Sequence, residues 1–257
     1  MAQVARALRR LLPDPDRDPF VALRSSSCDE DTETSMQAGV YDTFLYVRGL
    51  KSVLEHLRLT WAGMWSERAL YSRRQAGDIG RAPAGGVVVQ RMVRSRVSGV
   101  LQTVNVAGGN LRELVISVGL GLGEGIVSGL VAADLITVVK DQGPDRDPVH
   151  FNYLTNDKPR QMVFDTRRGR GTHLVDTLYH QRLRPAIEYT ELCEITRKAL
   201  TLEAAYGYPL DMEFALEDER LWLLQARPIT AILAEHQATL DHHPLREPPR
   251  LRPKTGD

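Results

Sequence analysis

The amino-acid sequence predicts an α+β fold, in which helices pack against a largely antiparallel sheet. Short apolar or alternating segments separated by turn residues are typical of strands, two longer segments show helical spacing, and Leu210–Thr230 has the pattern of a β-hairpin. With 257 residues, of which 42% are hydrophobic and 26% charged, the chain can form one substantial core or two small subdomains.

The first predicted elements are a short strand and a long helix. Residues Phe20 to Leu23 form an apolar strand, and Arg24 to Ser27 follow at its end. From Gly49 onward, apolar residues recur at steps of three and four, which predicts an amphipathic helix of up to about 25 residues. The stripe that we expect to lie in the core consists of Leu50, Val53, Leu54, Leu57, Trp61, Met64 and Trp65.

The middle of the chain predicts several strands and a second helix. The strands are expected over residues 86–93, 97–104, 111–118, 135–140, 149–154 and 161–165. A helix over about residues 188–206 should end where Gly207 and Pro209 interrupt it.

The closing hairpin carries the strongest chemical pattern. Asp211 and Glu213 alternate with apolar residues before a polar turn at Glu217 to Arg220. A three-residue or bulged turn would place Glu213 opposite Gln225, with Arg227 two residues further along on the same face. Carboxylate and amide oxygens suit Mg²⁺ that completes its shell with polyphosphate, and a guanidinium binds phosphate as a fork. The alternative is an amphipathic edge hairpin with a solvated polar face.

Two further segments offer polar groups to a ligand. Arg24 and the three hydroxyls after it could bind polyphosphate, unless Arg24 pairs with Glu30 or Asp31 at the surface. Gln90 interrupts what we expect to be a buried strand, where it either contacts a ligand or is satisfied by neighbouring backbone groups.

A glycine-rich segment follows the strand that ends near Val118. Its glycines do not have the spacing of a dinucleotide-binding fingerprint, so a conformational role is the better interpretation. Glu124 could cap a short helix that follows, and we do not expect it to be catalytic.

Composition excludes several classes of partner and compartment. The 33 basic and 33 acidic side chains give a net charge of zero, so no chain-wide field recruits nucleic acid or an anionic membrane. Cys28 and Cys193 are too few for a disulfide framework, which favours reduced thiols and a cytoplasmic protein. Residues 1–12 suggest an amphipathic surface helix that is too short to span a membrane.

Four segments, in order, resemble the nucleotide-binding domain of the phosphoenolpyruvate synthase, pyruvate phosphate dikinase and rifampicin phosphotransferase family. LDMEFALEDERLWLLQARPIT resembles its closing motif, with Phe214 where the family normally has Trp. The other three segments are VALRSSSCDEDTETSMQAGVYDTFLYV, the pair GGVVVQRMV and SGVLQT, and GLGEGIVSGLVAAD. Together they span about residues 20 to 230, so the resemblance is hard to explain by chance.

The resemblance implies an ATP-grasp fold in which two subdomains clamp ATP. It implies a nucleotide-binding domain over 20–232, and the composition of the two ends predicts an N-terminal helix and linker over 1–19 and a flexible tail over 233–257. In that interpretation Glu213 and Gln225 hold Mg²⁺, and Arg24 and Arg227 are the catalytic residues that bracket the phosphates. The residues implied to contact ATP are Arg24, Gly39, Thr43, Gln90, Glu213, Gln225 and Arg227.

The same resemblance implies groups that this chain does not supply. The family brings a phosphate-binding Lys before the Arg-Ser-Ser stretch, whereas the 23 residues before Arg24 contain none. We therefore expect an N-terminally truncated domain that passes a phosphoryl from Mg-ATP to a His on a separate carrier domain, with pyruvate or another acceptor bound elsewhere. The alternatives are a non-catalytic nucleotide-binding or regulatory module and a fragment of a split dikinase.

Overall fold

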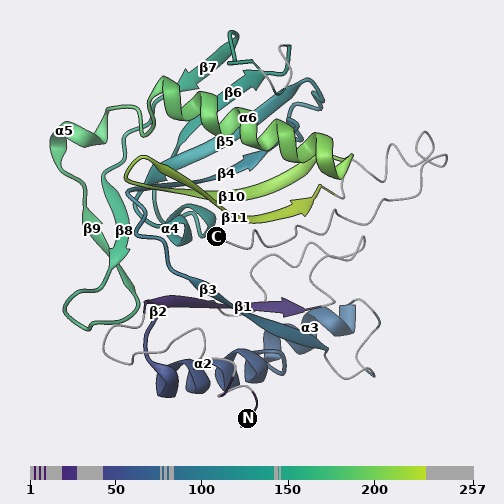
Figure 1. Ribbon diagram of the computed structural model, residues 1–257, viewed down its shortest axis with the longest axis vertical. Coiled ribbons are helices and arrows are strands. Elements are labelled where there is room, and N and C mark those ends of the chain that lie inside the picture. Colours follow the sequence, from purple (N-terminus) through teal and green to yellow (C-terminus); the bar gives the residue numbers. More distant parts are fainter. Residues whose placement is uncertain are drawn as a thin grey trace, which may run out of the picture. The chain divides into compact units, whose positions relative to one another are not determined.

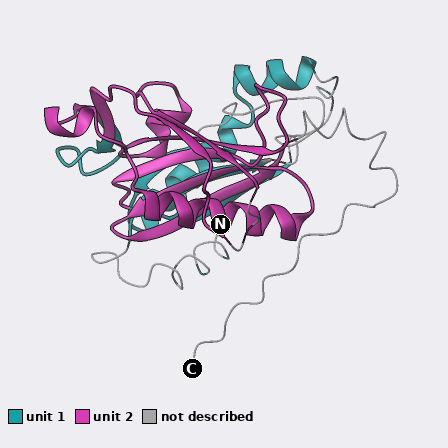
Figure 2. Ribbon diagram, turned by 90° about the horizontal axis from the view of Figure 1, so that it is seen from above, with its two compact units in different colours: residues 1–93, 163–173 teal, residues 94–162, 174–257 magenta. Residues whose placement is uncertain are grey.

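The computed structural model describes residues 19–27, 43–75, 84–141 and 146–229, together with the isolated positions 3, 6, 9, 77, 80 and 144. The chain divides into two compact units, which Figure 2 shows in different colours. Unit 1 comprises residues 1–93 and 163–173, and unit 2 comprises residues 94–162 and 174–257. The strand pairs of the two larger sheets are all antiparallel, so the predicted mixture of helices and antiparallel strands is confirmed.

Unit 1 contains a three-stranded sheet with the order β2-β1-β3. Its strands are β1 (Val21–Ser27), β2 (Phe44–Val47) and β3 (Gly85–Arg91). Helix α2 (Leu50–Gly63) packs on one face, where a small core forms from Val21, Leu23, Val47, Val53 and Leu57. The expectation that the first strand ends before Arg24 is wrong, because pairing with β3 extends β1 through Ser27 and puts Arg24 in mid-strand.

The long helix predicted from Gly49 is two helices, α2 and α3 (Glu67–Gln75). Ser66 lies between them, and its hydroxyl accepts a hydrogen bond from the Ala69 N–H at 3.3 Å, which favours a new helix start. The prediction of a fully buried aromatic stripe is also wrong. Trp61 in α2 is 36% exposed and Trp65, just after the end of α2, is 59% exposed, whereas Val53, Leu57 and Met64 of the same stripe are buried.

Unit 2 contains a six-stranded sheet with the order β11-β10-β4-β5-β6-β7. The strands are β4 (Val97–Gln102), β5 (Glu113–Leu120), β6 (Asp134–Val139), β7 (Phe151–Leu154), β10 (Leu210–Glu217) and β11 (Arg220–Pro228). Helix α6 (Tyr189–Tyr206) runs across one face of this sheet (Figure 1), and their contact forms the main hydrophobic core. The other face carries the polar side chains of β10 and β11.

The remaining elements are short. They are α4 (Gly123–Val127), β8 (Arg160–Phe164), β9 (Thr172–Asp176) and α5 (Tyr179–Arg182). Strands β8 and β9 pair as a separate two-stranded sheet, and residues 163–173 at its tip belong to unit 1. Phe164 in this tip stacks on Tyr46 of β2, with ring centroids 4.4 Å apart.

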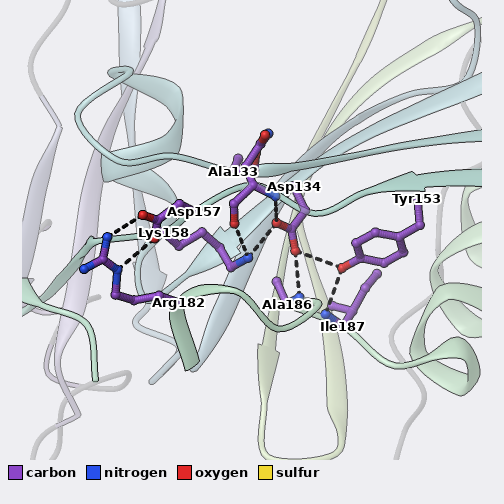
Figure 3. A network of polar contacts seen from close by, with 9 residues as sticks. Ala133, Asp134, Tyr153, Asp157, Lys158, Arg182, Ala186 and Ile187 are labelled. Carbon is purple, nitrogen blue, oxygen red and sulfur yellow. Dashed lines mark hydrogen bonds and ion pairs between the residues drawn. The ribbon is translucent and has the colours of Figure 1, made fainter. Parts of the chain in front are cut away.

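A buried polar network joins three parts of unit 2 (Figure 3). Asp134 and Lys158 are both fully buried, and Lys158 Nζ lies 2.6 Å from Asp134 Oδ1. Asp134 Oδ2 accepts hydrogen bonds from the Tyr153 hydroxyl at 3.0 Å and the Ala186 N–H at 2.8 Å. Because a buried charge without partners is costly, this pairing holds β6, β7 and the segment before α6 together.

Candidate functional site

The β10–β11 hairpin places Glu213 directly opposite Gln225, as the sequence predicts. The turn alone would not produce this pairing. Glu217 pairs with Arg220 across a two-residue turn, and in that register Glu213 would face Leu224. A register shift between Glu213 and Phe214 leaves Leu224 as an extra residue in β11, and this bulge brings the Gln225 amide opposite the Glu213 carboxylate.

Arg227 lies two residues beyond Gln225 and pairs with Asp211. Its Nε and Nη2 both donate to Asp211 Oδ2, at 3.0 and 2.8 Å. The Asp211 side chain is only 15% exposed and that of Arg227 is 36% exposed. Asp211 is not among the site residues predicted from the sequence, although the alternation that selects Glu213 puts Asp211 on the same face.

Core packing determines which face of the hairpin is polar. Phe214 is buried against the face that α6 covers, so Asp211 and Glu213 point to the opposite face. A Cβ at Gly99 would come within 2.5 Å of Phe214 Cζ and 2.7 Å of the Ser117 carbonyl oxygen. The glycine on β4 therefore makes room for the aromatic ring that fixes β10.

Unit 1 brings two further predicted residues onto one face. Ala22 pairs with Gln90 and Arg24 pairs with Val88, so Arg24 and Gln90 share the face of the β1–β3 pair away from α2. The expectation that Gln90 lies in a buried strand is wrong, because Val88 of the same strand is 47% exposed. Thr43 is exposed just before β2, whereas Gly39, Glu30 and Asp31 lie outside the described residues.

The glycine-rich segment has the conformational role that the sequence suggests. Gly121 has a φ of +81°, and a Cβ there would come within 2.3 Å of the Met162 carbonyl oxygen. The Ser98 hydroxyl donates to the Gly121 carbonyl at 2.9 Å, and the Leu122 N–H donates to Met162 at 2.9 Å. Glu124 lies in the first turn of α4, whose N-cap position is Leu122.

Within the described ranges, no group of three or more His, Cys, Asp or Glu side chains could hold a metal ion alone. One carboxylate facing one amide matches an ion that takes most of its ligands from water and phosphate. None of the described helices is long and apolar enough to cross a bilayer.

Comparison with known proteins identifies the family. The model of the pyruvate phosphate dikinase AMP/ATP-binding domain matches residues 1–245. Among curated proteins, the prodigiosin synthesizing transferase PigC of Serratia marcescens is 39% identical over 211 residues, which cover 82% of this chain and 22% of that protein. Rifampicin phosphotransferase of a Streptomyces species is 33% identical, over 90% of this chain and 26% of that protein. Phosphoenolpyruvate synthase of Pyrococcus furiosus is 32% identical, over 85% of this chain and 27% of that protein.

The chain thus spans about a quarter of the length of the curated relatives it matches. The resemblance read from the four sequence segments is confirmed, since one family model covers all four of them. This protein belongs to the family of pyruvate phosphate dikinase AMP/ATP-binding domains, whose relatives include phosphotransferases and phosphoenolpyruvate synthase.

Proposed function

We propose that this chain is an ATP-grasp nucleotide-binding domain that binds Mg-ATP and presents the terminal phosphoryl to a His on another domain or polypeptide. The observation that carries the proposal is the register of β10 and β11. It puts Glu213 opposite Gln225 and Asp211 opposite Arg227 on one face. Family membership supports ATP as the ligand.

The donor set on this face fits a magnesium polyphosphate. Glu213 and Gln225 would hold the ion, which when bound would offset the negative charge of the phosphates. No donor among the described residues reaches the buried Asp211 Oδ1, so this oxygen has capacity for a further ligand. Asp211 Oδ2 holds the Arg227 guanidinium in a fixed orientation, which prepares it to bind phosphate oxygens.

Unit 1 would supply the second set of phosphate contacts. Arg24 and Gln90 lie on its polar face, and Thr43 and Gly39 come from the segment before β2. In this interpretation units 1 and 2 correspond to the two subdomains of the ATP-grasp fold. The nucleotide-binding domain then occupies residues 20–232, between an N-terminal segment over 1–19 and a tail over 233–257.

The length of the relatives supports a carrier and an acceptor domain outside this chain. Their names specify different products or acceptors, including phosphoenolpyruvate, rifampicin and prodigiosin. We infer that this domain supplies the activated phosphoryl and that other domains select the acceptor.

Calorimetry with ATP tests the metal and nucleotide assignment. Binding in the presence of Mg²⁺ should be lost or strongly weakened when EDTA removes the metal, because Glu213 and Gln225 would bind the polyphosphate through the ion. Equal affinity under both conditions would remove the metal from the proposal, and no binding under either would refute it.

Phosphoryl transfer tests the need for a carrier. The chain should consume Mg-ATP slowly with pyruvate alone, and faster after addition of a His-bearing carrier domain from a related enzyme, because the carrier is the first acceptor. Rapid pyruvate-dependent ATP consumption without a carrier would contradict this division of labour.

A further inference from the structure

Arg96 lies where the chain enters unit 2, two residues after its first residue, Arg94. Its backbone joins two neighbouring segments. The Arg96 N–H donates to the Leu216 carbonyl at 3.0 Å, and its own carbonyl accepts from the Gly121 N–H at 2.8 Å. The entry segment is therefore fixed both to the end of β10 and to the glycine-rich segment.

The side chain of Arg96 contacts the turn of the β10–β11 hairpin. Its Nε donates to the Asp218 carbonyl at 3.1 Å. Asp218 has a φ of +53°, which is an uncommon conformation for a residue other than glycine and needs support from its surroundings. The guanidinium supplies that support from outside the hairpin.

The same guanidinium reaches the first turn of α6. Arg96 Nη2 forms an ion pair with Glu191 Oε1. The other oxygen of Glu191 accepts the Glu188 N–H at 2.8 Å, which completes the capping box of the helix. Arg96 thus ties the hairpin turn to the N-terminus of the helix that packs on the opposite face of the sheet.

The contacts of Arg96 bear on the register of the hairpin. Glu213 faces Gln225 only because a two-residue turn is combined with a bulge at Leu224. The turn sets the register of a hairpin, and a slip of one residue would move Gln225 away from Glu213. A contact that fixes the turn therefore fixes the spacing of the groups proposed to bind metal and phosphate.

We propose that Arg96 is a positioning residue for the phosphate-binding face of β10 and β11. This inference rests on the proposed function. Arg96 acts through the turn at Asp218 and through Glu191, without contacting the nucleotide itself. Because its side chain is 43% exposed, its ion pair contributes little to global stability, and its loss should affect ligand geometry more than folding.

The test compares Arg96→Met with the control Arg94→Met. Arg94 contacts Glu217 through its backbone N–H, at 3.0 Å, and this bond survives the substitution. Arg96→Met should raise the Kd for Mg-ATP on the order of fivefold to tenfold and leave the Kd for adenosine within about twofold, since only the phosphates meet the hairpin. Arg94→Met should change neither. Equal losses for both ligands, or none, would overturn the proposal.

Two milder variants separate positioning from a general structural role. Arg96→Lys can reach only one of the two partners, so it should recover part of the affinity for Mg-ATP. Glu191→Gln keeps the helix cap but removes the charge that holds Arg96, so it should reproduce part of the Arg96→Met effect. No rescue by Lys, together with wild-type affinity in Glu191→Gln, would argue against the mechanism.

Amide hydrogen exchange measures the same effect without nucleotide. Arg96→Met should accelerate exchange across residues 213–225, whereas Arg94→Met should not. Unchanged exchange in the hairpin would overturn the positioning role. If the wild-type chain binds no Mg-ATP, the proposed function fails, and the exchange data still decide whether Arg96 fixes the hairpin.

Discussion

The two sheets follow one plan at different scales. Each has one face covered by a helix and one face that carries candidate ligand groups. Among the residues that the structure describes, seventeen buried residues form the core between the sheet and α6 in unit 2, whereas five form the core between the sheet and α2 in unit 1. The proposed metal-binding hairpin thus lies on the larger of the two hydrophobic cores, and the strands that carry Arg24 and Gln90 lie on the smaller one.

This difference predicts different backbone dynamics in the two units. Local opening requires less free energy where less apolar surface is buried. We expect unit 1 to exchange its backbone amides faster than unit 2, and nucleotide to protect unit 1 more.

Removal of a core side chain should have the largest effect in unit 2. Phe214→Ala should lower the free energy of unfolding by about 3–5 kcal/mol, because the buried ring leaves a cavity against Gly99. Leu23→Ala in unit 1 should cost about 2–4 kcal/mol, and Leu223→Ala, at a position 38% exposed, much less. Urea denaturation measures all three. A Leu23→Ala variant less stable than Phe214→Ala would reverse the order of the two cores.

Glu213→Gln should uncouple nucleotide binding from the metal. The substitution keeps the size of the side chain but removes the one carboxylate proposed to bind Mg²⁺, so the Kd for Mg-ATP should rise by about 10-fold to 100-fold. Calorimetry with and without EDTA should then give similar values. Glu219→Gln, in the exposed turn of the same hairpin, is the control and should bind like the wild type.

Arg24→Gln should weaken ATP binding without removing its dependence on the metal. Loss of a charged phosphate contact should raise the Kd for Mg-ATP by roughly 10-fold and affect adenosine little. Arg91→Gln on β3 is the matched control, because Arg91 pairs with Val21 and lies on the opposite face. Equal behaviour of the two variants would place the phosphate contacts of unit 1 elsewhere.

Alkaline pH should weaken unit 2 through Tyr153. Burial and the neighbouring Asp134 raise the pKa of the Tyr153 phenol above its ordinary value. The folded state therefore keeps this proton more tightly than the unfolded state, so stability falls as pH rises above about 10, the ordinary tyrosine value. Tyr153→Phe should lose about 1–2 kcal/mol at neutral pH and show a shallower loss above pH 10. Denaturation at several pH values checks both; an unchanged alkaline slope would contradict the assignment.

Much of the architecture could be predicted because its signals are local. Alternation with a period of two predicted β10 and β11 and put Glu213 and Arg227 on one face. Gly207 and Pro209 predicted the end of α6, which the structure places at Tyr206. Strand β9 and helix α5 were missed, since elements of four or five residues carry little periodic signal.

The sequence by itself determined the family, the mixture of helices and antiparallel strands, and the polar face of the closing hairpin, because residue type and spacing encode them along the chain. Only the tertiary structure decided the bulge at Leu224, the pairing of Asp211 with Arg227, the mid-strand position of Arg24 and the exposure of Trp65. Each of these depends on which distant segments meet. The packing of Phe214 on Gly99 determines which face of β10 is polar, and the end of α2 before Trp65 determines that this side chain is exposed.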